Sequence, residues 1–85
     1  DVVPMAMGAA TKLRRVVQNV TNVIAIELMC AAQAIEGRRP LTSSPRIEEA
    51  VARIRKIVPP LGPDRVLAGD MAALAKAVSR GTFLV

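Results

Sequence analysis

Apolar residues dominate the stretch from Val23 to Ile35, where only Glu27 and Gln33 interrupt them. A helix that is apolar on every side belongs inside a helical bundle or in a membrane. At about 1.5 Å per residue this run spans roughly 20 Å, short of the roughly 30 Å of hydrocarbon in a bilayer, and a carboxylate lies in its middle. We therefore predict the buried core helix of a helical assembly, covered mostly by other chains or by other parts of a larger protein.

The same periodicity continues towards the N-terminus and predicts one long central helix. Apolar residues recur at spacings of three and four, with polar side chains on the opposite side of its first half. Because Pro4 bars regular helix before it, we expect a helix over about 5–36, roughly 45 Å long. Gly37 is expected to end it as a left-handed cap, and Pro40 prevents its resumption.

A second, shorter helix is predicted over about 45–58. Ser44 is placed to cap it and Pro45 to occupy its first position. Glu49 and Arg53, four residues apart, form a favourable pair on its surface. One face of this helix is apolar and the other charged, which is typical of a helix that covers a core on one side.

A third helix is predicted over about 71–80, with Asp70 as its cap and Gly81 at its end. Before it, residues 62–64 (Gly-Pro-Asp) predict a turn, followed by a single helical turn. The fold class is therefore all-α. One long central helix and two shorter ones form a single helical segment, residues 1–85, that belongs to an oligomeric helical bundle.

Composition supports helix packing with a partner. Hydrophobic residues make up 52% of the 85 residues, mean hydropathy is +0.36, and Phe83 is the one aromatic residue. Ala, Val, Ile and Leu without aromatics favour close helix–helix contact. A chain of this length buries only a modest share of its surface, so its own core is marginal and its excess apolar surface calls for other chains.

The net charge of +5 raises the question of a nucleic-acid partner. The densest basic group, Lys12, Arg14 and Arg15, has no aromatic residue beside it on which a base could stack. We interpret the cations as solvated helix faces and expect neither a nucleic-acid nor a membrane partner. A basic nucleic-acid-binding helical protein remains the weaker alternative.

Catalytic chemistry is poorly represented. The chain has no histidine and a single cysteine, Cys30, which excludes a histidine base, a zinc site of the usual kind and an internal disulfide. Within the apolar run we expect Cys30 to be a small buried hydrophobe. No catalytic, cofactor-binding or metal site is predicted, and without a signal-peptide pattern we expect a cytoplasmic protein.

Two polar residues in the apolar run need partners. Glu27 would be costly to bury unless paired, so we expect an ion pair or hydrogen bond to a neighbouring helix, or a place near a cavity formed with another chain. For Gln33 we expect a buried amide bonded across a helix interface.

Three arginines flank the loop after the long helix. Arg38, Arg39 and Arg46 are expected to meet carbonyls or acidic side chains at helix ends.

The residues expected at an oligomer interface share one side of the long helix: Val20, Ile24, Glu27, Leu28, Ala31 and Ile35.

Three stretches carry a family resemblance: DVVPMAMGAA, NVIAIELMCAAQAIEGRRPLTSSP and VPPLGPDRVLAGDM. Their order resembles the carboxyl-terminal part of histidine ammonia-lyase and its relatives, the tyrosine and phenylalanine ammonia-lyases and aminomutases. The likeness runs roughly from Asp1 to Val78. Its most specific parts are IEL-x-x-AAQ at 26–33 and RRPL-x-x-SP at 38–45, while Pro4 and Ala6 stand where the family usually has Ser and Gly.

The resemblance implies a mostly helical tetramer that removes ammonia from L-histidine or an aromatic L-amino acid, or converts it to the β-amino acid. It also implies a methylidene-imidazolone group made from Ala-Ser-Gly, a tripeptide absent here, and an active-site Gln or Glu immediately before Asp1. We therefore expect a carboxyl-terminal segment of a lyase-like chain, inactive alone, whose partners are further copies in a homo-tetramer and the missing amino-terminal part. The alternative is a free-standing helical oligomerisation or interaction module.

Overall fold

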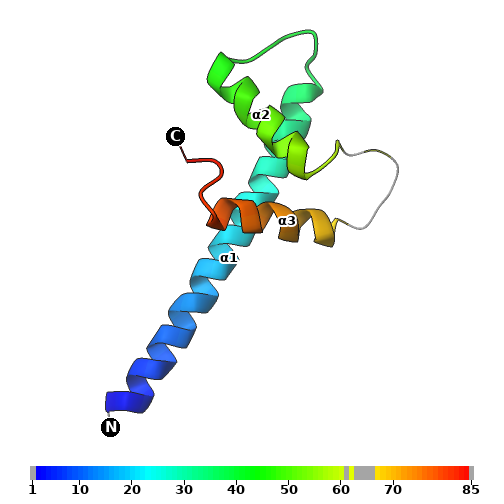
Figure 1. Cartoon of the computed structure of the whole chain (residues 1–85). Helices are drawn as coiled ribbons and strands as arrows, with labels where there is room; N and C mark the ends of the chain where they lie inside the picture. The colour runs from blue at the N-terminus through cyan, green and yellow to red at the C-terminus, as the bar shows by residue number, and fades with distance from the viewer. Residues whose placement is uncertain (1, 61, 63–66, 85) are drawn as a thin grey trace.

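The computed structural model describes residues 2–60, 62 and 67–84, with side chains from Met5 onward. These residues form three helices and no strand, which confirms the all-α class (Figure 1). The helices are α1 (Val2–Glu36), α2 (Pro45–Ile57) and α3 (Ala68–Ser79).

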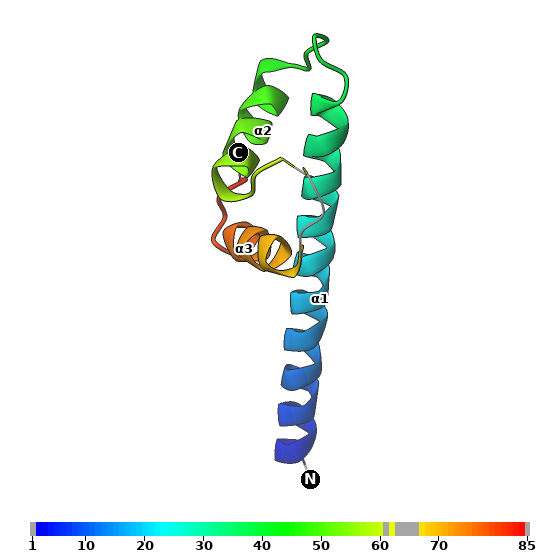
Figure 2. The same cartoon turned by 90° about the vertical axis from the view of Figure 1, so that its right-hand side faces the viewer.

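Helix α1 is a rod that carries the other two helices on one side of its C-terminal half. The described chain measures 61 × 31 × 17 Å along its principal axes. Figure 2 shows that the N-terminal half of α1 projects beyond α2 and α3. At 35 residues, α1 is about 52 Å long.

Helix α1 begins at Val2, three residues before the predicted start. Pro4 lies in its first turn, where backbone N–H groups have no acceptor within the helix, so its missing N–H removes no hydrogen bond. The left-handed cap predicted at Gly37 was wrong, because Gly81 is the residue with a positive φ in the described chain. Instead α1 tightens at its end, where Arg38 N donates to Ile35 O at 3.1 Å.

Helix α2 starts as the sequence predicts. The Ser44 hydroxyl accepts a hydrogen bond from Ile47 N at 3.4 Å, and Pro45 occupies the first helical position. The predicted pair forms between Arg53 Nη2 and Glu49 Oε1 at 2.8 Å. The helix ends at Ile57, one residue earlier than predicted, because Val58 has extended backbone angles.

Helix α3 begins at Ala68, three residues before the predicted start. Leu67 holds the capping position and makes no side-chain cap, so the prediction that Asp70 caps this helix was wrong. Asp70 lies instead in the first turn, where a carboxylate complements the helix dipole. The turn predicted at 62–64 and the helical turn after it lie outside the described residues, apart from Gly62.

The end of α3 confirms the prediction that Gly81 ends this helix. Gly81 has a φ of +79°, its N–H donates to Val78 O, and Thr82 N donates to Ala77 O, both at 3.1 Å. These two bonds are the Schellman motif, which needs a residue in the left-handed region. The motif reverses the chain so that Phe83 packs against the core.

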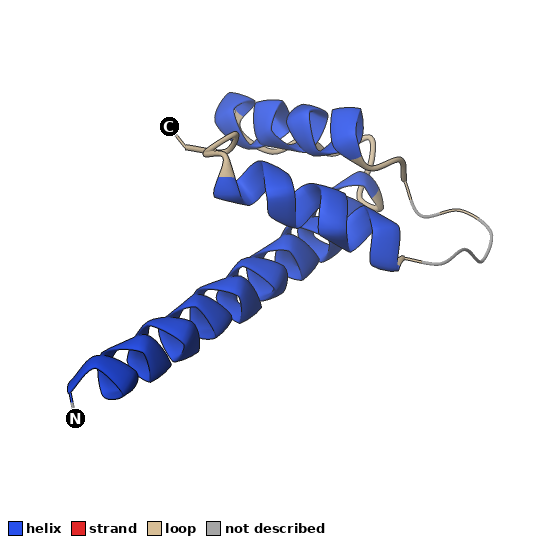
Figure 3. Cartoon of the chain, turned by 60° about the horizontal axis from the view of Figure 1, so that its bottom comes forward, coloured by secondary structure: helices blue, strands red, loops and turns tan. Residues whose placement is uncertain are grey.

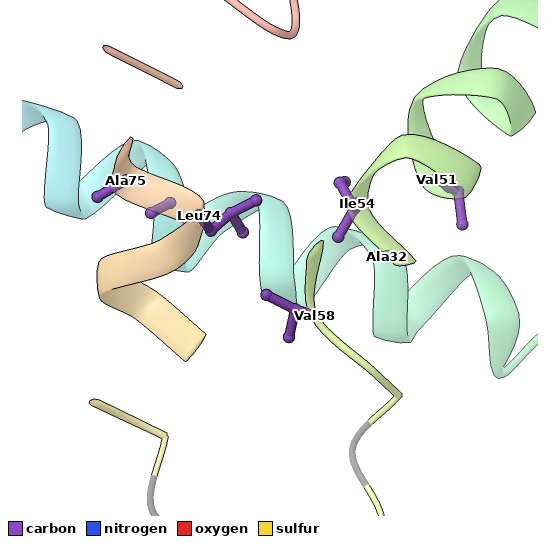
Figure 4. Close-up of a cluster of buried hydrophobic side chains, with 7 residues drawn as sticks. Ala32, Val51, Ile54, Val58, Leu74 and Ala75 are labelled. Carbon is purple, nitrogen blue, oxygen red and sulfur yellow. The ribbon is translucent and has the colours of Figure 1, made fainter. Parts of the chain in front are cut away.

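The core is small and lies where the three helices meet (Figure 4). Helix α1 contributes only alanines to it, which allows its neighbours to approach closely. Leu74 and Val58 are the largest fully buried side chains. The whole cluster consists of Ala25, Ala32, Val51, Ile54, Val58, Leu74 and Ala75.

Candidate functional site

The most prominent surface feature is a row of large apolar side chains along one side of α1. We call it the apolar stripe: Leu13, Val16, Val17, Val20 and Ile24. Their exposed fractions run from 38% to 64%. They recur at spacings of three and four, which aligns them on one face of the helix. A row of this kind is typical of a helix that packs against another surface.

The predicted interface residues continue this stripe towards the C-terminus. At 100° per residue, their mean direction lies roughly 100° around α1 from the buried Ala25 and Ala32. Val20, Ile24, Glu27 and Ala31 are exposed, whereas Leu28 and Ile35 are half-buried at the edge of the core. Helices α2 and α3 therefore pack on a neighbouring face, and the predicted interface stays a prediction.

Most of the run from Val23 to Ile35 is open in this chain, and its predicted burial by other chains or other parts of a larger protein stays a prediction. Only Ala25 and Ala32 of that run are buried. Helices α2 and α3 cover one side of α1, and most other faces of the run are open. Cys30 is accordingly exposed in this chain, and its predicted burial within an assembly stays a prediction.

Glu27 and Gln33 behave differently. Glu27 is exposed, and within the described residues its carboxylate makes no ion pair or hydrogen bond. Gln33 does bond to another helix, because its Oε1 accepts from Arg55 Nη2 at 3.3 Å. The predicted cross-helix bond of Gln33 is thus confirmed, although the residue is exposed rather than buried.

Arg55 is the polar residue that sequence reasoning missed. Its Nε donates to Glu36 Oε1 at 2.7 Å, and its Nη1 lies 3.4 Å from both Val58 O and Pro59 O. Only 15% of its side chain is exposed. We call Arg55, Glu36 and Gln33 the α1–α2 clasp. The sequence shows Arg55 as one more cation in the last turn of a helix, and only the fold brings it to the end of α1.

Arg39 is the arginine of the loop whose predicted partner is present. Its Nη2 lies 2.7 Å from Glu48 Oε1 in the first turn of α2, and its Nη1 donates to Leu41 O at 3.3 Å. The side chains of Arg38 and Arg46 make no such contact within the described residues. The prediction that all three meet acceptors at helix ends therefore holds for Arg39 alone.

The described residues bring no group of three or more His, Cys, Asp and Glu side chains together as a metal site. Among them, no helix is both long and apolar enough to cross a membrane. Across the described residues, the arrangement leaves apolar helix surface exposed beside a small core. Such a fold is typical of a helical packing segment.

Comparison with known proteins places this segment. Residues 1–56 match the aromatic amino acid lyase family. The chain is 51% identical over 84 residues to histidine ammonia-lyase of Symbiobacterium thermophilum, covering 99% of this chain and 17% of that protein. It is 48% identical over 81 residues to histidine ammonia-lyase of Anaeromyxobacter sp. strain K, covering 95% of this chain and 16% of that protein.

Histidine ammonia-lyase of Rhodospirillum rubrum is 45% identical over 83 residues, which cover 98% of this chain and 16% of that protein. No solved structure matches the chain. The chain belongs to the aromatic amino acid lyase family. It spans about one sixth of the length of these relatives, at 16–17%.

Proposed function

We propose that this chain is a segment of a histidine ammonia-lyase and that α1 supplies packing surface to the core of a homo-tetramer. The observation that carries this function is the apolar stripe, which α2 and α3 leave uncovered. Relatives named histidine ammonia-lyase, at 45–51% identity, support the histidine-type parent.

The energetics favour a partner on the stripe. Each stripe side chain is roughly half exposed, so burying the remainder contributes about 1 kcal/mol per residue. Glu27 lies on the same side of α1, one turn beyond Ile24, with its carboxylate open. A cation on the partner surface would compensate that charge as the interface forms.

The proposed parent removes ammonia from L-histidine with an electrophile formed from Ala-Ser-Gly. This chain contains no such tripeptide and so cannot form the electrophile. Another part of the parent would have to supply the electrophile. We therefore propose that the segment alone has no lyase activity. Its contribution is to hold the helical core together.

An activity measurement tests the first half of the proposal. Purified chain incubated with L-histidine should release no urocanate, whereas the full-length lyase that contains this segment should release it at a rate proportional to enzyme. Urocanate from the pure chain would contradict the proposal. A full-length protein inactive on L-histidine but active on L-tyrosine or L-phenylalanine would contradict the histidine assignment.

Sedimentation tests the packing function. Val20 and Ile24 are the best positions to change, because Leu28 also touches the core and its loss would disturb the fold. The double variant Val20→Asp, Ile24→Asp should abolish self-association of the chain and of the full-length tetramer. The matched control Thr11→Asp, Asn19→Asp adds the same charge on other faces of α1 and should leave the mass unchanged.

Equal masses for the two variants would contradict an interface on the stripe. A separate measurement distinguishes the remaining alternative. If source cells contain this sequence only as a 9.0 kDa protein, the free-standing interaction module replaces the lyase segment.

A further inference from the structure

Four cationic side chains surround an open groove between α2 and α3. Helix α2 contributes Arg53 and Lys56, while Lys76 and Arg80 come from the end of α3. The groove has a volume of about 490 Å³, within the usual range of small-ligand sites. Figures 1 and 2 show both helices on the same side of α1. None of the groove residues belongs to the apolar stripe, so the two surfaces are distinct.

Three of the four cations meet no carboxylate among the described residues, although Lys56 and Lys76 lie in the last turn of a helix, where the dipole favours positive charge. Arg53 pairs with Glu49 and also donates to Thr82 O at 3.1 Å. Within the described residues, the side chains of Lys56, Lys76 and Arg80 have no ion-pair or hydrogen-bond partner. By contrast, Arg39 and Arg55, elsewhere on the same fold, both meet carboxylates.

The spacing of the cations adds a cost that an anion would relieve. Arg53 and Lys56 lie three residues apart, and Lys76 and Arg80 four, so each pair sits on one helix face. Like charges at these spacings repel and destabilise a helix. An anion placed between the two pairs would attract the cations of both and offset the two repulsions.

We propose that this groove binds a small anion with two adjacent charged groups, of the diphosphate class. A single charged group can be held by one cation pair, whereas a diphosphate can engage the cations of both helices at once. Arginine adds bidentate hydrogen bonds that suit phosphoryl oxygens. Ile57, Ala73 and Ala77 are the apolar residues that line the same groove.

Titration with inorganic pyrophosphate at low ionic strength tests the site, both on this chain and on the full-length lyase that contains it. Binding should saturate at one site per chain. The variant Lys76→Ala, Arg80→Ala should weaken it about tenfold or more, since each charged hydrogen-bond donor contributes substantially to affinity. The matched control Lys12→Ala, Arg14→Ala removes the same charge from α1 and should bind as wild type does.

Further binding measurements could also contradict the proposal. Sulfate, with one charged group, should bind more weakly than pyrophosphate, and equal affinity would overturn the two-group assignment. If the double variant loses helicity, Lys56→Gln replaces it, because this exposed change leaves the core intact. Equal weakening in groove and control variants, or no saturable binding, would overturn the site. Pyrophosphate binding by the chain but not by the full-length lyase would show that another part of the parent covers the groove, which also overturns the proposal.

Discussion

The C-terminal half of α1 is more apolar than the N-terminal half, and the two halves have different surroundings. In the bare half, residues 5–20, every side chain is exposed, including Leu13, Val16 and Val17 at 51–64%. In the covered half, residues 21–36, Ala25 and Ala32 are 0% and 1% exposed, and Leu28, Met29 and Ile35 pack beside them in partly buried positions. Alanines are the most buried residues of this half, whereas the large side chains of the bare half are left exposed.

Polar interactions differ in the same way. Those of the bare half are local, such as Thr11 Oγ1 donating to Met7 O at 2.9 Å. The covered half is tied to α2 by the α1–α2 clasp, with a 19-residue separation between Glu36 and Arg55. A helix held only by local bonds opens at low free energy. The bare half should therefore be the least protected part of the isolated chain, and it should become protected if the proposed tetramer forms through it.

The largest effect should come from removing the core contact of α3. Leu74 is fully buried, and Leu74→Ala should lower the free energy of unfolding by about 2–4 kcal/mol, from lost burial and the cavity left behind. With α3 loosened, the covered half should exchange its amide hydrogens nearly as fast as the bare half. Urea unfolding and hydrogen exchange measure the two effects.

Leu84→Ala is the matched control, because Leu84 is 79% exposed. It removes the same atoms and should change stability by less than about 0.5 kcal/mol. Similar losses in both variants would contradict the core position of Leu74.

A smaller effect should follow from breaking the α1–α2 clasp. Arg55→Met keeps the bulk of the side chain but leaves Glu36 without its cation, and should cost about 1–2 kcal/mol, since the pair is only partly exposed. Arg53→Met is the control: its pair with Glu49 is 44% and 63% exposed, and such surface pairs contribute about 0–0.5 kcal/mol. A double-mutant cycle with Glu36→Gln should show coupling for Arg55 and none for Arg53; the reverse would refute the clasp.

The sequence predicted well whatever depends on neighbours along the chain. The Ser44 cap, the Glu49–Arg53 pair and the end of α3 at Gly81 are all set by residues within five positions of one another. Each follows from local hydrogen bonding or local charge, so periodicity and capping rules suffice. The starts of α1 and α3 also depend on neighbouring residues, but more than one start is compatible with the local sequence. Pro4, for example, fits into the first turn of α1.

What the sequence did not predict depends on which face of α1 meets its neighbours. Val23 to Ile35 is apolar almost all round, so its pattern cannot single out the side that Ala25 and Ala32 define. For the same reason the sequence did not predict the role of Arg55, which depends on the position of Glu36. It also did not predict that Cys30 and Gln33 are exposed in this chain. Glu27 is recognisable in the sequence as a carboxylate that needs a partner, but none of the described residues supplies one.

The smallest effect tests the bare half directly, through glycine. Gly8 lies inside α1 with no atom within 4 Å of an added Cβ, so Gly8→Ala should stabilise the bare half by about 0.5–1 kcal/mol and slow its hydrogen exchange. Gly81→Ala makes the same chemical change at a φ of +79°, where the new Cβ would lie 3.0 Å from Leu84 Cδ1. It should destabilise by about 1 kcal/mol. If Gly8→Ala lowered the free energy of unfolding, as Gly81→Ala should, local backbone preference would not govern the bare half. The bare half would then be held by packing even in the isolated chain.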